Sequence, residues 1–451
     1  YRMEASSAMD ASSRWKGFPT FGVAWHLGEE EFIKRLGFIS LIKIRYSWGQ
    51  SGNAPSGTSP YIGTFEAVTP GYGDMNAVKP ASPDLTHLKY ETITSNNIGV
   101  DFGLFSDKVN FTFELYKKVT DDLLQKKMKV PSSTGLSTVA WYNSGKIQNK
   151  GWEFNIDIAA VKTKDWSFNF GFNISQNKNE ILELPENKND ELYTFGNKNY
   201  AYSVMMGDPL GSFYGYRYKG VYQNVEETYA VNTSGQRILD IDGNPVVMKN
   251  GDQKVYPGDA RYEDVNGDGV IDENDIVYLG NSNPTLTGGL NFTLRYKKVS
   301  LVAAFHGRAG QKVINQARMD MENMRGKNNQ SVAVLRRWRS EGDDTDIPRA
   351  LYDKGYNYLG SDRFVEDASF LRLKTVTLKY QMPAKWMKAI GVNKLELYAT
   401  GYDMFVWTKY KGQDPEVNLK AANDGTVAQV AIDSNNTPKP FKIAFGLNLN
   451  F

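Results

Sequence analysis

Cysteine is absent from this chain of 451 residues, and its charges of opposite sign nearly balance. The lack of cysteine excludes disulfides, thiolate zinc sites and cysteine nucleophiles. A formal net charge of +2 argues against a nucleic-acid-binding protein, which would gather basic residues on one face. The densest basic run, Lys126-Lys127-Met128-Lys129, is short and typical of a solvated strand end.

Long hydrophobic runs are also missing. No stretch approaches the roughly 18 consecutive apolar residues that suggest a transmembrane helix. The chain begins at Tyr1-Arg2-Met3 without a signal peptide or an initiator methionine, and Tyr1 to Ala5 already resemble the end of a strand. We therefore expect the sequence to start inside a larger protein.

Apolar residues recur at every second position over long segments, and this is the main signal in the sequence. Near the end, one face carries large apolar side chains at Phe441, Ile443, Phe445, Leu447, Leu449 and Phe451, and the other carries Lys442, Asn448 and Asn450. The same alternation recurs at 42–48, 109–116, 152–159, 166–174 and 290–296. Segments of about nine to eleven residues match strands that cross a bilayer at a tilt, whereas soluble strands average about five or six.

A soluble antiparallel sheet would give the same alternation. A membrane barrel is favoured because the apolar faces carry no charge and have aromatic residues near the strand ends, as interfacial girdles require. About thirteen strands are expected, near 1–6, 18–27, 39–50, 88–105, 108–121, 150–161, 165–177, 213–223, 286–297, 299–307, 368–381, 393–405 and 440–451. Long polar stretches separate many of them, at 51–87, 122–149, 178–212, 224–285, 308–367 and 406–439.

The links 106–108 and 297–298 are short enough to be tight turns, so we expect short turns at one barrel end and long extracellular loops at the other. Segments 29–36 and 311–340 show helical character within the loops. An open sheet edge cannot lie in lipid, so further strands are needed to close the barrel. The predicted fold class is all-β, and residues 1–451 are the C-terminal part of one large antiparallel transmembrane β-barrel domain.

Several motifs occur in an order that resembles the SusC/RagA-like family of TonB-dependent outer-membrane transporters. The match runs across essentially the whole chain, which makes it specific. Its pieces lie at Arg14–Thr20, Val23–Trp25, Glu31-Phe32, Ile42–Asn53, Asn149–Glu153, Gly207–Gly211, Asp264–Gly269, Arg337-Trp338, Ile347–Arg349, Ala368–Lys374, Asp414–Val417 and the terminal aromatic strand.

The resemblance implies a barrel of about 22 strands around an N-terminal plug that this sequence lacks. It also implies energy coupling through the TonB-ExbB-ExbD system, a SusD-like lipoprotein partner and contact with outer-membrane lipid. The expected function is active import of an oligomeric nutrient, glycan or peptide, across the outer membrane of a Gram-negative bacterium. The terminal strand ending in Phe451 matches the family's barrel-assembly signal.

Two alternatives stay open. A non-transporting surface barrel could act as an adhesin or structural binding protein, and it would lack an upstream plug and TonB box. A soluble, calcium-stabilised β-protein would be extracted without detergent. An enzyme is not expected, because the three histidines lie far apart and no nucleophile or paired-acid arrangement is found.

One loop fits the register of an EF-hand-like calcium site. Oxygen ligands would come from Asp264, Asn266, Asp268, the Val270 carbonyl, Asp272 and Asp275, with Gly269 making the sharp turn. The last ligand is shorter than the usual glutamate and no clear helix precedes the loop, so a metal-free Asp/Gly-rich turn is the alternative. Separately, loop aromatics could stack on sugars or peptide side chains, or could simply pack the loops together. They are Trp141, Tyr142, Tyr356, Tyr358, Trp407 and Tyr410.

Overall fold

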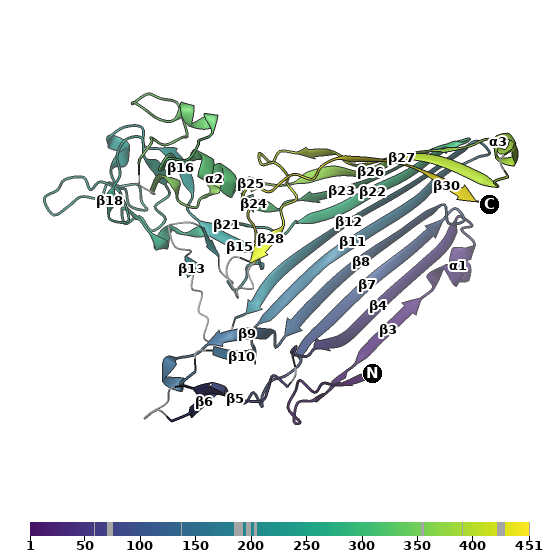
Figure 1. Cartoon of the computed structure of the whole chain (residues 1–451), viewed down its shortest axis with the longest axis horizontal. Helices are drawn as coiled ribbons and strands as arrows, with labels where there is room; N and C mark the ends of the chain where they lie inside the picture. Colours follow the sequence, from purple (N-terminus) through teal and green to yellow (C-terminus); the bar gives the residue numbers. More distant parts are fainter. Residues whose placement is uncertain are drawn as a thin grey trace.

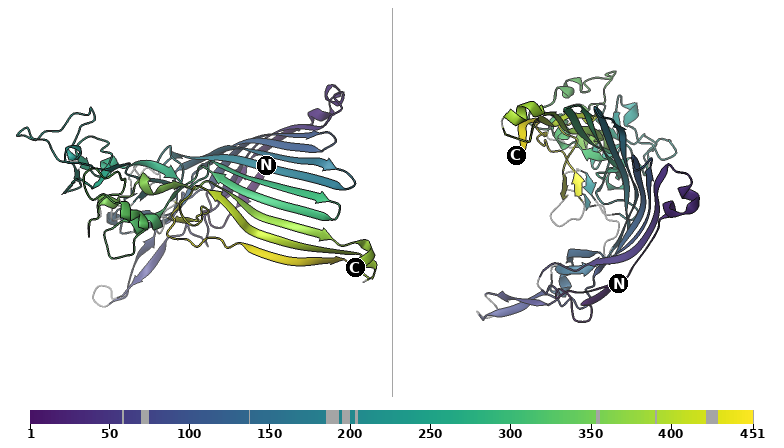
Figure 2. Two further views of the ribbon diagram at one scale, coloured as in Figure 1. Left: turned by 90° about the horizontal axis from the view of Figure 1, so that it is seen from above. Right: turned by 90° about the vertical axis from the view of Figure 1, so that its right-hand side faces the viewer.

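One antiparallel sheet of eleven strands dominates the computed structural model and curls into an open arc (Figures 1 and 2). The structure describes the chain except for residues 58, 70–74, 137, 185–192, 195–199, 203–204, 353–355, 390, 422–428 and 451. In spatial order, the strands of this arc are β3 (Thr20–Trp25), β4 (Ile39–Asn53), β7 (Glu91–Leu104), β8 (Val109–Asp121), β11 (Lys146–Lys162), β12 (Trp166–Glu183), β22 (Leu286–Tyr296), β23 (Val299–Ala309), β26 (Phe370–Gln381), β27 (Lys394–Thr408) and β30 (Lys442–Asn450).

The length of these strands confirms the membrane-barrel pattern. All but β3 have between the 9 residues of β30 and the 18 of β12. Every neighbouring pair is antiparallel, and the spatial order of the strands is their order in the chain. Within the described ranges, no helix is long and apolar enough to cross a bilayer.

The two ends of the arc differ sharply, as expected from the loop lengths (Figure 1). At one end the links are 105–108, 163–165 and 297–298, together with two short helical links. Phe105, Ser106, Asp107 and Lys297 adopt positive φ there, which lets the chain reverse tightly. At the other end the connections are long: 54–90, 122–145, 184–285, 310–369 and 409–441.

The register sorts the sheet into one apolar face and one polar face. On the last two strands, Leu395, Leu397, Ala399 and Gly401 lie opposite Leu449, Leu447, Phe445 and Ile443. Glu396 lies opposite Asn448 on the other face. Ile443, Phe445, Leu447 and Leu449 thus alternate with Lys442, Asn448 and Asn450 along β30, while Phe441 precedes the strand and Phe451 lies outside the described residues. That the apolar set faces lipid stays a prediction. In a transmembrane barrel the apolar face is the outward one.

Two of the thirteen expected strands do not join the arc. Segment 1–6 forms β1 (Arg2–Ala5), which pairs with β2 (Trp15–Phe18) in a separate two-stranded sheet. Segment 213–223 divides into β15 (Ser212–Gly215) and β16 (Tyr218–Val221), which belong to small sheets among the long connections. All four residues of β15 are buried, so its chain packs on both faces instead of showing one face to lipid.

The remaining strands form small sheets at the long-loop end or its margins. They are β5 (Thr64–Val68), β6 (Ala77–Ser82), β9 (Leu124–Lys129), β10 (Thr138–Asn143), β13 (Tyr193–Thr194), β14 (Ala201–Tyr202), β17 (Lys249–Asn250), β18 (Gln253–Lys254), β19 (Ala260–Tyr262), β20 (Val270–Ile271), β21 (Val277–Asn281), β24 (Lys312–Ile314), β25 (Val365–Asp367), β28 (Leu419–Ala421) and β29 (Gln429–Ala431).

Helices are few and short, and they lie in the connections. Those predicted near 29–36 and within 311–340 are confirmed in shortened form. The described helices are α1 (Glu31–Lys34), α2 (Gln316–Glu322) and α3 (Ala384–Ala389), with the 3-10 turns η1 (Leu27–Glu29), η3 (Ser132–Thr134), η4 (Glu226–Thr228), η5 (Glu273–Asp275), η6 (Val332–Arg336), η7 (Tyr356–Tyr358) and η8 (Asp362–Phe364).

The buried clusters lie outside the arc, and the two with the most residues lie among the long connections. One cluster gathers Tyr216, Tyr222, Met248, Tyr262 and Ile271, and a second gathers Tyr200, Phe213, Ile314, Tyr358 and Phe364. Both join residues of 184–285 to residues of 310–369. We call the described residues of these two connections the loop module. Because it has its own apolar cores, the module is a packed structure at one end of the arc and not a set of separate loops.

Candidate functional site

The polar face of the arc carries a charged cluster on β4, β7 and β8. Arg45 Nε lies 3.1 Å from Asp101 Oδ2, and Arg45 Nη2 also contacts the Glu114 carboxylate. Thr112 donates its hydroxyl to Asp101 Oδ1 at 3.1 Å. Gly99 leaves room for the guanidinium, because a Cβ there would lie 2.5 Å from Arg45 Cζ. With one cation for two carboxylates, this cluster carries a negative excess on the wall that faces the barrel interior.

A polar recess lies on the same face of the arc as the Arg45 cluster, toward the short turns. Its volume is about 200 Å³, and its lining includes Asn110, Asp157, Asn169, Asn291 and Thr293 from four neighbouring strands. Amides and hydroxyls donate and accept hydrogen bonds, while the carboxylate accepts them. This wall is therefore suited to water or a polar solute.

The long-loop end of this face holds a buried ion-pair network. Arg372 Nη2 on β26 lies 2.5 Å from Asp414 Oδ1, and Arg372 Nε lies 3.2 Å from Glu416 Oε2. Lys374 and Lys439 also contact Glu416 Oε2, at 3.2 and 2.5 Å. The network ties connection 409–441 to the barrel wall. It also brings together the motifs Ala368–Lys374 and Asp414–Val417, which sequence reasoning treated separately.

Charge and burial act in opposite directions on Glu416. Burial alone would raise the pKa of this carboxyl, but hydrogen bonds from Lys439 and Lys374 outweigh it and lower the pKa to about 2. A depressed carboxyl pKa stabilises the fold above the ordinary value of 4.5, and the contribution is lost as pH falls toward 2. At neutral pH, Glu416 is therefore ionised and holds connection 409–441 in place.

A second buried carboxylate joins the two halves of the loop module. Arg349 contacts Asp259 with two nitrogens, Nε at 2.6 Å and Nη2 at 3.1 Å. Asn357 donates its side-chain amide to Asp259 Oδ1 at 3.3 Å. Gly258 has a φ of +85°, and a Cβ there would lie 2.2 Å from the Trp338 ring. The motifs Arg337-Trp338 and Ile347-Pro348-Arg349 therefore clamp 310–369 onto 184–285.

A polar pocket of about 710 Å³ opens on the loop module. We call it the module pocket. Its charged side chains form pairs: Arg217 Nη1 and Lys219 Nζ lie 3.0 and 3.2 Å from Glu263, and Arg261 Nη1 lies 3.8 Å from Glu227. The lining also includes Tyr222, Tyr229, Asn232, Thr233 and Asp264. Half-exposed charges of both signs beside aromatic rings suit a polar ligand of the size that pockets in the 300–1,000 Å³ range accept.

The six aromatic residues proposed from the sequence do not form one site. Tyr356, Tyr358 and Tyr410 are buried, and Tyr358 belongs to the second core of the loop module. Tyr410 donates its hydroxyl to Asp433 at 2.7 Å. These three tyrosines pack the loops, which was the alternative interpretation, because burial leaves no ring face for a ligand.

The other three proposed aromatics lie in two further places. Trp141 packs against the cluster of Phe18, Leu88 and Tyr90, and Tyr142 donates its hydroxyl to Gln125 at 2.8 Å. Trp407 is half exposed, but it lies on the apolar face, opposite Leu371 and 6.4 Å from the Phe305 ring centroid. Such a position is that of an interfacial girdle residue and not of a substrate contact inside the barrel.

The predicted calcium loop is described in full, and its carboxylates point to its own backbone. Asp264 accepts hydrogen bonds from the N–H groups of Gly267, Asp268 and Gly269 at 2.7, 3.3 and 2.8 Å. Asp275 is buried and accepts from the Val265 N–H at 2.7 Å. In the described part of the chain, no three His, Cys, Asp or Glu side chains gather to hold a metal. This geometry does not support a cage, and calcium binding stays a prediction.

The hydrogen bonds of this loop lead to a test. In Asp264→Ala, the amides of Gly267 and Gly269 lose their acceptor, so we expect their hydrogen exchange to accelerate both in calcium and in a chelator. Because the Asp264 carboxylate accepts these backbone N–H groups directly, wild-type protein should keep this protection in chelator. Hydrogen-exchange mass spectrometry over 262–276 measures both. Loss of protection in wild-type protein on chelation would show instead that calcium holds the loop.

The module pocket and the buried ion pairs of Arg372 and Arg349 could not be predicted from the sequence, because their residues are remote from one another in the chain. Arg372 and Asp414 are 42 residues apart, and Arg349 and Asp259 are 90 apart. No local spacing joins them. The available signal was a charged residue within an otherwise apolar motif, as in Phe370-Leu371-Arg372-Leu373, which hinted at a buried partner.

The arc, its apolar outer face and its polar inner face define a segment of a transmembrane antiparallel β-barrel. The family model described as "TonB dependent receptor-like, beta-barrel" matches residues 4–255, which is more than half of the chain. The chain belongs to this family. It is a family of outer-membrane receptors and transporters and not of enzymes, as the sequence indicated.

Individual relatives agree with this assignment. The chain is 31% identical to TonB-dependent receptor P26 of Formosa agariphila and 27% identical to TonB-dependent receptor SusC of Bacteroides thetaiotaomicron. Both matches cover all of this chain, but only 44% and 41% of those proteins. The solved RagAB peptide importer in its closed-closed state superposes with a TM-score of 0.76 at 23% identity, over 100% of this chain and 45% of that one. The chain thus spans less than half the length of these relatives, and the RagAB likeness shows the shared fold.

Proposed function

We propose that this chain forms the C-terminal wall and loop module of an active importer of oligomeric nutrients. The observation that carries the proposal is the module pocket above a polar barrel wall. A small-ion porin needs no packed module with a charged pocket of about 710 Å³. Long connections of this size also lose much conformational entropy on ordering, which a binding role would explain.

Membership of the family supports an energy source and an orientation for this importer. Import by a TonB-dependent receptor uses the TonB-ExbB-ExbD system, which would act through upstream parts of the whole protein. The long connections would face the outside of the cell, where nutrient first arrives, and the polar wall would line the path inward. The substrate class is an oligomer, either a peptide or a glycan, because the module pocket offers both paired charges and tyrosine rings.

Growth on defined nutrients tests this function. A strain lacking the whole gene should lose growth on one class of oligomer, peptide or glycan, and regain it with the wild-type gene. Arg217→Ala with Arg261→Ala should restore growth only in part, because both cations line the module pocket. Lys79→Ala is the matched control, since this exposed lysine pairs with Glu66 on the separate β5–β6 sheet.

A protonophore supplies the second arm of the same experiment. Uptake of labelled oligomer into cells should stop when the proton gradient collapses, while binding at the surface persists. A null strain that grows as well as wild type on every oligomer would remove the importer proposal. Binding without any energy-dependent uptake would favour the adhesin-like surface barrel.

We also propose a SusD-like lipoprotein as the partner at the loop end. The loop module exposes large apolar side chains: Ile241 is fully exposed, and Leu239, Val332, Leu335 and Tyr352 are more than half exposed. A protein docked on the module would cover these side chains, which supports a partner at this end. Purification of the tagged whole transporter from native membranes in mild detergent should recover a stoichiometric lipoprotein. Recovery of the barrel alone in several detergents would contradict the lidded importer.

A further inference from the structure

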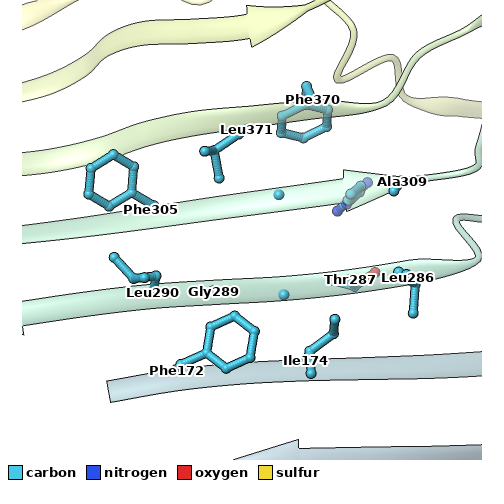
Figure 3. A pocket seen from close by; sticks show the side chains of 13 residues that line it. Phe172, Ile174, Leu286, Thr287, Gly289, Leu290, Phe305, Ala309, Phe370 and Leu371 are labelled. Atoms are coloured by element: carbon cyan, nitrogen blue, oxygen red, sulfur yellow. The ribbon is translucent and has the colours of Figure 1, made fainter. Parts of the chain in front are cut away.

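The apolar face of the arc contains a groove of about 560 Å³ near the long-loop end (Figure 3). Its floor is a pair of glycines, Gly288 on β22 and Gly307 on β23, which lie directly opposite each other. In the same row across the sheet, Ile174 lies opposite Gly288 on one side and Leu371 lies opposite Gly307 on the other. Two missing side chains between two large ones leave the depression.

The surroundings of both glycines disfavour a side chain, most strongly at Gly288. A Cβ on Gly288 would lie 2.8 Å from the Asn173 carbonyl oxygen, which real structures do not tolerate. A Cβ on Gly307 would lie 3.0 Å from the Phe370 carbonyl oxygen. A side chain at Gly288 would clash with the backbone, and one at Gly307 would require the Phe370 carbonyl to shift, so the floor of the depression stays bare.

The groove runs along the strands and is closed at one end. Leu290 and Phe305, which lie opposite each other, close it on the side of the short turns. On the loop side the next pair is Leu286 and Ala309, and the single methyl group of Ala309 leaves the mouth open. Figure 3 shows Leu290 and Phe305 side by side on neighbouring strands, with Leu286 and Ala309 farther along the same two strands.

The mouth lies at one margin of the apolar band. Leu286, in the mouth, is ten residues from Tyr296, which marks the other margin, or about 34 Å along an antiparallel strand. A tilted strand of that length crosses the roughly 25 Å apolar band of an outer-membrane barrel. At the loop-side margin, Trp152 donates its indole N–H to Gln176 at 2.6 Å, and Gln176 lies opposite Leu286. A hydrogen-bonded tryptophan at this level marks the headgroup boundary.

We propose that this groove is a specific site for one acyl chain of a bilayer lipid from the leaflet beside the long loops. The occupant is a lipid because the groove is continuous with the apolar face, which the bilayer covers in this family. The driving force is packing and not water exclusion, since lipid tails are as apolar as leucine. An empty groove would forfeit dispersion contacts along its floor and walls, and a chain lying along the strands restores them.

Photolabelling of the whole transporter tests the site. The protein is placed in nanodiscs of dimyristoyl phosphatidylglycerol that contain a small fraction of phosphatidylcholine with a mid-chain diazirine. After irradiation, labelled peptides are mapped by mass spectrometry. We expect peptides that carry Leu290 and Phe305 to be labelled several-fold more than the peptide that carries Phe445, an exposed position on the same face outside the groove.

Two matched variants separate the groove from the rest of the face. Ala309→Phe places a ring in the mouth and should lower groove labelling to the level at Phe445. Ala399→Phe, also on the apolar face but opposite Phe445 and Leu378, should leave it unchanged. Leu286→Trp closes the mouth from the other strand if Ala309→Phe fails to fold. Uniform labelling of the face, labelling unaffected by a closed mouth, or protein–protein crosslinks at the groove would each overturn the proposal.

Discussion

Replacing Arg372 with methionine will destabilise the loop-bearing wall by about 3–5 kcal/mol, the usual cost of removing one partner from a buried ion pair. The Arg372 side chain is 3% exposed and Asp414 is 8% exposed. Without the guanidinium, Asp414 keeps hydrogen bonds from the backbone N–H groups of Glu416 and Lys439, at 2.9 and 3.2 Å, but no side-chain cation. Its charge would then be buried and uncompensated, while Glu416 still has Lys374 and Lys439.

Urea unfolding of the purified whole protein in detergent, followed by heat-modifiable gel mobility, measures this loss. Lys79→Met is the matched control, because it breaks an exposed pair at 2.8 Å and should change the midpoint little. Adding Asp414→Asn to Arg372→Met should recover part of the stability, since the uncompensated charge is gone. If Arg372→Met unfolds at the same urea midpoint as Lys79→Met, the ion-pair network does not stabilise the wall.

The arc could be predicted from the sequence because each of its strands carries its own signal. Alternation along one segment needs no knowledge of neighbours, and the eleven strands of the arc lie at segments predicted from the sequence. The same criterion misplaced 1–6 and 213–223. Ser212–Gly215 is buried on every residue within the loop module, and Arg2–Ala5 is only four residues long in an exposed pair. A strand of about four residues is too short for its alternation to distinguish a membrane-spanning strand from a strand within the loops.

The candidate site could not be predicted in the same way because it is built from distant residues. Arg217 meets Glu263, and Arg261 meets Glu227, because β16 pairs with β19 beside the first core of the loop module. The aromatics chosen from the sequence were chosen for exposure in loops, and Tyr356, Tyr358 and Tyr410 are buried there instead. Loop residues have no periodic face, so burial could not be read from their spacing. The alternation of the last strand, by contrast, is visible in its own sequence, although its pairing with β27 is not.

Substituting Phe445 on that last strand should strongly impair membrane insertion. Phe445 is 82% exposed on the apolar face, opposite Ala399, near the middle of β30. An arginine on the lipid face near midplane costs about 2–4 kcal/mol, and an aspartate somewhat less, because lipid offers the charge neither water nor a partner. Phe445→Arg and Phe445→Asp should therefore lower the folded fraction of the whole protein in outer membranes, in that order of severity.

Asn448→Asp is the matched change on the polar face of the same strand, and it should be tolerated. Asn448 donates its side-chain amide to Glu396 at 3.4 Å, so the new carboxylate would lie beside an existing one. Lys379 and Lys394 lie 3.8 and 3.9 Å from Glu396 and can compensate, and the barrel interior also supplies water. Membrane fractionation with heat-modifiable mobility compares the variants at equal expression. Equal losses at Phe445 and Asn448 would mean that the two faces of β30 do not see lipid and lumen, and the assignment of outside and inside for the whole arc would fall with it.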